Sequence, residues 1–379
     1  ASLLALILWA MPILAAPRAS VMRDGPVAED PVFWMVRDGE PTATIIIARD
    51  PVPSNEFAAE ELRNHVQLIS GAELPIKSAA EKVQGPKVLI GESRLTEGLD
   101  LDVPSGFSRE LHEEGFLIKT TGEDLILVGN DTGPVHRRQL MGFENTYKGS
   151  LHAVYEILER LGCRWYYPGN FGRVVPTSKN VSLGAVDELI KPSFPVRGFW
   201  YGAAASRRRD PEFRKMMDLW MVRNRFLAYG SVLDSAGDGS VMRPFHKMRR
   251  VERDGEKKRV NVLFEEHPEY FALRKDGTRT SHYLCLSNPE VVRIATEYAI
   301  QFFQDHPERW TFGYAPPDGV PTCECEECRK HNYNFMQKPP ADPNVQDISE
   351  GFYRFLDQVA DRVSERFPDK WITATAYSG

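Results

Sequence analysis

The sequence predicts an α/β protein, in which an N-terminal α/β sandwich domain (residues 30–190) precedes the first part of a (β/α)8 TIM-type barrel (residues 191–379). Three observations predict it. Short β-rich runs alternate with one-faced helices up to residue 182, strand then helix recurs after residue 191, and Lys191-Pro-Ser193 constrains the backbone between the two patterns. The length of 379 residues also exceeds one ordinary core.

The chain opens with an apolar run, Leu3–Ala15, that only Pro12 interrupts. It is too short to span a bilayer, but it has the length of the core of a secretory signal. We interpret residues 1–19 as a signal-peptide remnant, which predicts an exported bacterial protein at the periplasm, the cell surface or outside. A buried N-terminal helix is the alternative. No other segment is long and apolar enough to cross a membrane, so no stable membrane span is expected.

The first domain begins with a predicted strand at Thr44–Ala48. A helix is expected from Pro53 to Gly71, because apolar residues recur on one face and a glycine ends it. Those apolar residues are Phe57, Ala58, Leu62, Val66 and Ile69.

A strand at Val88–Ile90 is expected next. Gly115–Lys119 and Leu125–Val128, separated by a short turn, predict a hairpin. The apolar positions between Leu151 and Leu161 then predict a second amphipathic helix, which Gly162 closes.

The second domain has a different order of elements. A strand at Phe194–Trp200, a helix at Pro211–Arg225 and a short run at Phe226–Tyr229 lead into a long polar insertion that ends near His282. Strands are then expected at Tyr283–Ser287, Trp310–Tyr314 and Trp371–Tyr377, with helices at 289–306 and 348–367 between them. About five strands of eight are present, so the sequence predicts a barrel truncated at residue 379. A short open sheet is the alternative.

Four segments of the first domain resemble the N-terminal domain that α-glucuronidases and β-hexosaminidases share. These segments are Ala58–Leu62, Gly71–Ile76, Ala153–Glu159 and Gly162–Tyr166. The resemblance implies an accompanying barrel, but such barrels have several specificities.

Two further blocks are similar to domain-of-unknown-function family 4838. They are His267–Leu273 and the Cys323-x-Cys325-x-x-Cys328 motif behind Pro317-Asp318-Gly319. Some members of that family are classed as endo-acting β-N-acetylglucosaminidases. The resemblance therefore implies a glycoside hydrolase that acts on a complex glycan, with β-N-acetylhexosaminide-type linkages expected.

The expected chemistry is cleavage by a pair of acidic residues. Glycosidic cleavage needs a proton donor and a second group that stabilises the oxocarbenium ion, and barrels place such groups at the C-terminal ends of strands. Asp318 follows Trp310–Tyr314, where similar hexosaminidases have an Asp-Glu pair, but Gly319 replaces the second acid. Glu266 and Glu269 of the insertion are the other candidates. A simple turn at Pro316–Gly319 is the alternative.

The expected substrate-binding residues are Arg197, Trp200, Tyr201, His246, His267 and Tyr314. An arginine can fork two sugar hydroxyls, as similar hexosaminidases do, and flat aromatic rings can stack on sugars. A salt bridge for Arg197, core packing for the aromatic residues and a turn-capping role for His267 are the structural alternatives.

Three cysteines lie within six residues, at Cys323, Cys325 and Cys328, and His331 follows them. Three thiolates and an imidazole suit a structural zinc ion, while export favours a disulfide between Cys325 and Cys328. Free thiols are the third alternative. Cys163 and Cys285 lie in apolar runs and are expected to be buried. A catalytic zinc is disfavoured, because four protein ligands would close the site, so no cofactor is expected to be required for catalysis.

Charge patterning excludes a broad phosphate-binding surface. The formal net charge is −6, and acids flank the run Arg207–Arg209, so no nucleic-acid partner is expected. The sequence favours an exported hydrolase of oligosaccharides or polysaccharides. A non-catalytic glycan-binding protein is the alternative, and a protein that uses the cysteines for metal chemistry ranks third.

Overall fold

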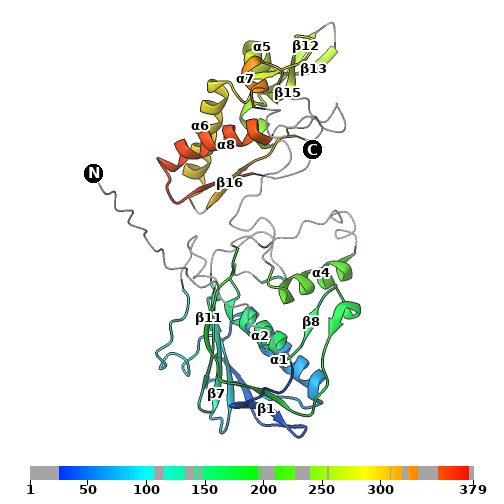
Figure 1. Ribbon diagram of the computed structural model, residues 1–379, viewed down its shortest axis with the longest axis vertical. Coiled ribbons are helices and arrows are strands. Elements are labelled where there is room, and N and C mark those ends of the chain that lie inside the picture. Colours follow the sequence, from blue (N-terminus) through cyan, green and yellow to red (C-terminus); the bar gives the residue numbers. More distant parts are fainter. Residues whose placement is uncertain are drawn as a thin grey trace, which may run out of the picture.

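The computed structural model describes most of the chain and shows a mixed α/β protein (Figure 1). The described residues are 25–105, 115–132, 141–143, 147–194, 197, 210–226, 240–253, 256–307, 309–317, 323–331 and 349–374. The expected leader, most of the strand expected at Phe194–Trp200, the run after Phe226 and residues 375–377 of the last strand lie outside them. Trp200, Tyr201 and Asp318 lie outside them as well.

The first unit is built from eleven strands and three longer helices among the described residues. The strands are β1 (Phe33–Arg37), β2 (Glu40–Pro41), β3 (Thr44–Ile47), β4 (Ile76–Ser78), β5 (Lys87–Ile90), β6 (Phe116–Thr121), β7 (Asp124–Gly129), β8 (Arg164–Trp165), β9 (Arg173–Val174), β10 (Val181–Leu183) and β11 (Asp187–Ile190). The helices are α1 (Pro53–Ser70), α2 (Gly149–Arg160) and α4 (Pro211–Arg223), with a 3-10 turn, η2, at Asn170–Gly172.

A six-stranded sheet with the order β11-β6-β7-β5-β3-β4 forms the centre of this unit. Strand β3 runs parallel to β4 and β5, and β5 runs parallel to β7. The hairpin expected between residues 115 and 128 is confirmed, because β6 and β7 pair antiparallel with Ile118 opposite Leu127. A smaller sheet, β10-β1-β2, adds Phe33 and Val181 to the same core.

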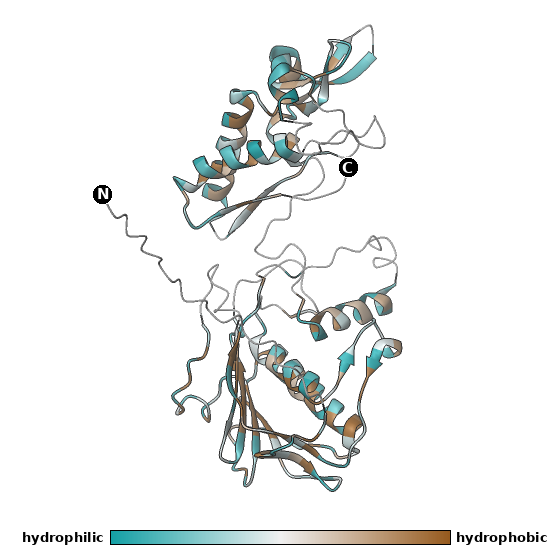
Figure 2. Ribbon diagram, in the orientation of Figure 1, coloured by the Kyte–Doolittle hydropathy of each residue, from teal (hydrophilic) through white to brown (hydrophobic). Residues whose placement is uncertain are grey.

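Helices α1 and α2 bury their apolar stripes in one core against the central sheet. The helix expected from Pro53 to Gly71 is confirmed: Pro53 starts it, and Gly71 ends it at φ 81°, a left-handed conformation that glycine adopts without strain. Leu62 and Val66 are fully buried. The second predicted helix buries Leu151 in the same way. Figure 2 shows the strands of this unit as largely hydrophobic, as expected for a sheet covered on both faces.

Helix α4 packs on the core of the first unit, although it follows the expected boundary at residue 191. Met221 and Val222 belong to that core, and Arg223 donates two hydrogen bonds to the Glu61 carboxylate, at 2.8 and 2.9 Å. The Tyr155 hydroxyl donates a third, at 3.1 Å. Because this ion pair is nearly buried, its extra hydrogen bonds offset the cost of removing two charges from water.

The second unit contains six strands and four helices among the described residues. The strands are β12 (Met248–Arg253), β13 (Glu256–Asn261), β14 (Phe271–Leu273), β15 (Arg279–Leu284), β16 (Thr311–Tyr314) and β17 (Trp371–Ala374). The helices are α5 (Val262–Glu266), α6 (Pro289–Asp305), α7 (Glu326–Arg329) and α8 (Ser349–Ser364), with 3-10 turns η3 (Ser240–Phe245) and η4 (Pro268–Tyr270).

Strands β16 and β17 are parallel, with Phe312 opposite Ile372, and α8 lies between them in the chain. This is the strand–helix–strand unit that the alternating pattern predicts. Only the start of the strand expected at Tyr283–Ser287 is confirmed. Strand β15 ends at Leu284 and pairs antiparallel with β14, because the insertion supplies a neighbouring strand that its polar composition concealed.

A second apolar core holds this unit together. Phe245 and Phe271 from the insertion lie in it beside Phe303 of α6, Phe312 of β16 and Phe355 of α8, all at most 1% exposed. The insertion is therefore part of the folded unit. None of the helices in the part of the chain that the structure describes is long and apolar enough to cross a membrane.

A buried carboxyl group lies where β7 meets the start of α2. Asp131 accepts hydrogen bonds from the backbone N–H of Ser150 at 2.9 Å and from its hydroxyl at 2.6 Å. Gly129 and Gly149 allow this approach, because a Cβ on Gly149 would lie 2.6 Å from the backbone nitrogen of Asn130. Burial raises the pKa of Asp131 to about 6, although the bonds from Ser150 oppose the shift.

We expect Asp131→Asn to gain stability relative to the parent protein as pH rises from 4 to 7. The folded-state pKa lies above the ordinary value of 3.8, so the parent loses stability as pH rises through this window, by about 3 kcal/mol at most. Urea unfolding of both proteins at pH 4.5 and 7 measures the difference. The exposed variant Asp100→Asn is the control, and an equal Asp131→Asn effect at both pH values would contradict the prediction.

Candidate metal centre

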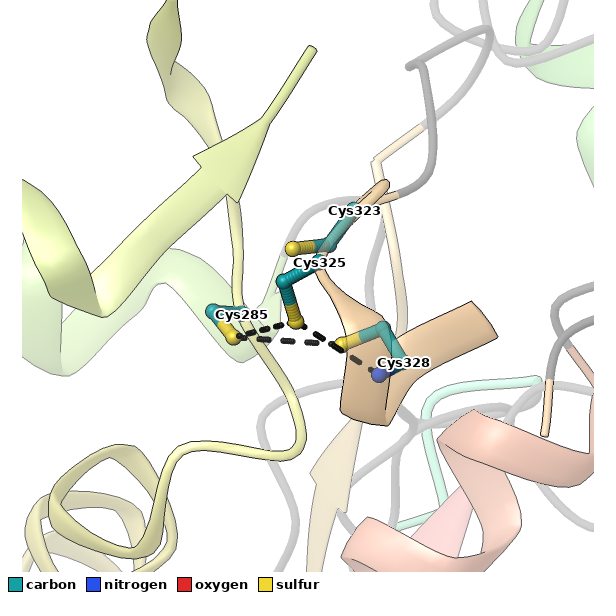
Figure 3. A group of neighbouring side chains, drawn as sticks. All are labelled: Cys285, Cys323, Cys325 and Cys328. Carbon is teal, nitrogen blue, oxygen red and sulfur yellow. Dashed lines mark hydrogen bonds between the residues drawn. The ribbon is translucent and has the colours of Figure 1, made fainter. Parts of the chain in front are cut away.

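Four cysteine side chains converge in the second unit. The sulfur atoms of Cys285, Cys323, Cys325 and Cys328 all lie within 4.8 Å of one another (Figure 3). We call them the sulfur tetrad. Three of the side chains are buried, and Cys325 is partly exposed.

Cys285 reaches the tetrad from the end of β15. Its backbone N–H donates to the Tyr270 carbonyl at 2.9 Å, and its own carbonyl accepts from Asn288 N–H at 3.0 Å. The Asn288 side chain then accepts from Glu290 N–H and caps α6. The junction between β15 and α6 therefore holds Cys285 in place.

The other three cysteines come from the segment that enters α7. Cys325 is the N-cap of this short helix, and its sulfur accepts from Cys328 N–H at 3.5 Å. The Cys323 sulfur accepts from Leu273 N–H in β14 at 3.3 Å, and the Cys328 sulfur accepts from the Ser287 hydroxyl at 3.0 Å. Such outer donors orient metal-binding thiolates.

The sulfur separations match a tetrahedral zinc site. The Cys285 sulfur lies 3.6 Å from that of Cys325 and 3.8 Å from that of Cys328. Zinc binds thiolate at about 2.3 Å, which gives a tetrahedron with sulfur–sulfur edges of about 3.8 Å. A disulfide would need about 2.05 Å. All five cysteines are free thiols.

The charges within the tetrad also favour a cation. Hydrogen bonds from Cys285 and Cys328 lower the pKa of Cys323, so one thiolate forms readily. Hydrogen bonds with Cys323 and Cys328, and then burial, raise the pKa of Cys285. Four thiolates at this distance need a divalent cation to offset their repulsion. With four protein ligands no position is open for water, so the arrangement suits a structural role.

The expectation that His331 completes the site needs correction. The Nδ1 atom of His331 lies 3.5 Å from Glu350 Oε1, and the ring does not belong to the tetrad. Cys285 takes the fourth position instead. It is buried, as expected, but its partners come from a segment about 40 residues later, which spacing alone does not reveal.

The acids expected in the insertion are exposed. Glu266 ends α5, and Glu269 lies in η4, where its carboxylate is 3.0 Å from His267 Nδ1. A hydrogen bond from its own backbone N–H, then the bond with His267, lower the pKa of Glu269. An ionised Glu269 suits charge stabilisation better than proton donation. The ring of His267 stacks on Tyr270 at 4.7 Å.

Two of the expected substrate-binding residues donate hydrogen bonds to backbone carbonyls. The prediction for Tyr314 needs correction, because its ring is fully buried and its hydroxyl donates to the Ala295 carbonyl at 2.7 Å. Arg197 donates to the carbonyls of Arg225 and Phe194, at 2.9 and 2.7 Å. His246 is exposed, and its pKa is lowered first by partial burial and then by His282.

The tetrad lies within the segment that a family model matches. A model described as a domain of unknown function (DUF4838) matches residues 167–379, more than half of the chain. The chain belongs to the DUF4838 family. The description of this family assigns no activity to it. No curated protein matches the sequence.

Several solved structures of glycoside hydrolases resemble the DUF4838 chain at low identity. A family GH115 4-O-methyl-α-glucuronidase with specificity for decorated arabinogalactans is 13% identical, with a TM-score of 0.39, over 90% of this chain and 42% of that one. A chitobiase of Flavobacterium johnsoniae is 9% identical, with a TM-score of 0.34, over 90% of this chain and 50% of that one. A Streptomyces plicatus β-hexosaminidase is 11% identical, with a TM-score of 0.34, over 92% of this chain and 64% of that one. The chain thus spans less than two thirds of the length of each of them.

We expect the purified protein to contain one zinc ion per chain, and Cys285→Ser to lose most of it. Three thiolates remain in that variant, but the metal loses a ligand and the fourth position opens. Elemental analysis measures the metal content. Cys163→Ser, another buried cysteine, and His331→Ala are the controls, and both should keep the ion. Zinc loss in His331→Ala with retention in Cys285→Ser would contradict the tetrad.

Proposed function

We propose that this chain belongs to an exported glycan-acting hydrolase whose second unit contains one structural zinc ion. The single observation that carries the zinc assignment is the sulfur tetrad, with separations of 3.6 and 3.8 Å from Cys285. Its donor set is the one that closed zinc sites use. Bound zinc would also protect the thiols from the oxidation that an exported protein meets.

The metal would anchor the loop on which we place the catalytic acid. In the sequence, Asp318 lies four residues after Tyr314, the end of β16, and five before Cys323, a ligand of the tetrad. The start of this loop is held too, since Ala315 N–H donates to the Ser240 hydroxyl at 2.7 Å. Both ends of the Asp318 loop are therefore restrained.

The parallel pair β16–β17 with its α8 crossover supports a catalytic role for this loop. In a (β/α)8 barrel the catalytic groups follow the C-terminal ends of such strands. We propose that these strands belong to a barrel of this kind, with Asp318 as proton donor for β-N-acetylhexosaminide-type linkages. The ionised carboxylate of Glu269, or that of Glu266, would stabilise the positive charge that develops on the sugar.

The remaining substrate contacts are proposed for the other candidates that the sequence indicates. His246 and His267 carry polar groups in the insertion, and Trp200 and Tyr201 would supply flat faces for sugar rings. Arg197 would position neighbouring backbone, because it already bonds to two carbonyls. A non-catalytic glycan-binding protein would use the same surface without a proton donor.

We expect Asp318→Asn to lower turnover of a cleavable glycan by about a hundredfold or more, because the leaving oxygen loses its proton donor. Measuring kcat on a panel of N-acetylhexosamine-containing glycans identifies the substrate and tests the variant. Asp357→Asn, on the exposed face of α8, is the matched control. Unchanged turnover in Asp318→Asn would contradict the catalytic assignment, and binding without turnover by the parent protein would favour the non-catalytic alternative.

A further inference from the structure

An exposed, basic β-hairpin lies at one end of the second unit. Among the strands that the structure describes, β12 and β13 pair only with each other, and they form the hydrophilic ribbon at the top of Figures 1 and 2. Arg249, Arg250, Lys257, Lys258 and Arg259 are all exposed. The hairpin therefore presents its charges to the solvent.

The hairpin concentrates positive charge in an acidic protein. Residues 247–261 contain seven lysines and arginines and three acids, a net charge of +4, whereas the whole chain carries −6. A local reversal of this size attracts anionic partners even when the net charge of the protein is negative.

The strand register sorts these charges onto two faces, because directly opposed residues share a face and successive residues alternate. Arg250 lies opposite Arg259, and on the same face Lys257 lies opposite Glu252. We call Arg250, Lys257 and Arg259 the arginine face. On the other face, Lys258 is neutralised by Glu256 at 3.2 Å. Among the residues that the structure describes, no carboxylate lies within ion-pairing distance of the arginine face.

The pairing of Arg250 with Arg259 costs stability, because like charges directly opposite each other repel. An anion that bridges the two guanidinium groups would remove this repulsion. The Cβ atoms of opposed side chains on one face of a hairpin lie about 5 Å apart, so both guanidinium groups can reach neighbouring anionic groups of one polymer. The guanidinium fork matches a carboxylate in two parallel hydrogen bonds.

We propose that the arginine face binds the carboxylates of an acidic, uronate-containing polysaccharide. The inference rests on the proposed glycan-acting function and names its substrate class. The hairpin would hold one part of the polysaccharide while a neighbouring part of the same polysaccharide reaches the proposed site after β16. A nucleic acid is disfavoured, because a row of phosphates needs more cations than the three that the arginine face offers.

Isothermal titration of the purified protein with polygalacturonate at low salt tests the proposal. We expect Arg250→Gln/Arg259→Gln to weaken binding about tenfold or more, since each lost charge-assisted contact is a substantial share of the affinity. Arg249→Gln/Lys258→Gln removes the same charge from the other face and should change the affinity by about twofold or less. Binding by the parent should weaken in 0.5 M salt.

The outcomes separate this inference from the proposed hydrolase. No binding of polygalacturonate by the parent, equal losses in the two double variants, equal binding of neutral dextran, or tighter binding of single-stranded DNA would each overturn it. Asp318→Asn should still bind polygalacturonate. Arginine-dependent binding without turnover of any glycan would therefore support the binding role of the hairpin and contradict the proposed hydrolase activity.

Discussion

The convergence of four cysteine sulfurs is the constraint on which the second unit depends. It joins the end of β15, the start of α7 and, through Leu273, the strand β14. Strands β14 and β15 also bury Phe271 and Leu284 in the apolar core, whereas α7 has only four residues. A short helix of this kind has almost no intrinsic stability, so its position must come from its contacts. One tetrahedral ion would supply them through directed bonds.

In the first unit, polar contacts inside an apolar core fix the positions of the helices relative to the strands. The Asp131 carboxyl links the end of β7 to the first turn of α2, and Glu61 ties α1 to Arg223 of α4. In each case a group that would be costly to bury alone is saturated with hydrogen bonds. These contacts specify which helix end meets which strand end, while apolar burial provides most of the stability.

Together these features suggest a division of labour along the chain. The tetrad and β16 restrain both ends of the loop that carries Asp318, and the basic hairpin projects from the same unit. Glycosidases need acids held at defined separations, but they bind polymeric substrates over much larger surfaces. In the proposed hydrolase, a loop restrained by zinc would meet the first requirement, and the exposed hairpin would meet the second.

The sequence by itself determined the local elements of this protein. The stripe from Ala58 to Ile69 with its closing Gly71, and the two β-rich runs that form β6 and β7, depend on contacts between residues close in the chain, which periodicity and turn chemistry encode. The Cys-x-Cys-x-x-Cys spacing left a zinc site, a disulfide and free thiols as alternatives. Only the tertiary structure decided that Cys285 completes the tetrad in place of His331, because that choice depends on how β15 packs.

The pairing of strands and the fate of single side chains were also decided by the tertiary structure. Strand β15 pairs antiparallel with β14, a partner hidden in a polar insertion, and Tyr314 turns into the core to meet the Ala295 carbonyl. An aromatic residue at the end of a strand can face either a cleft or the core. Which of the two it faces depends on elements distant in the sequence, so no local pattern records it.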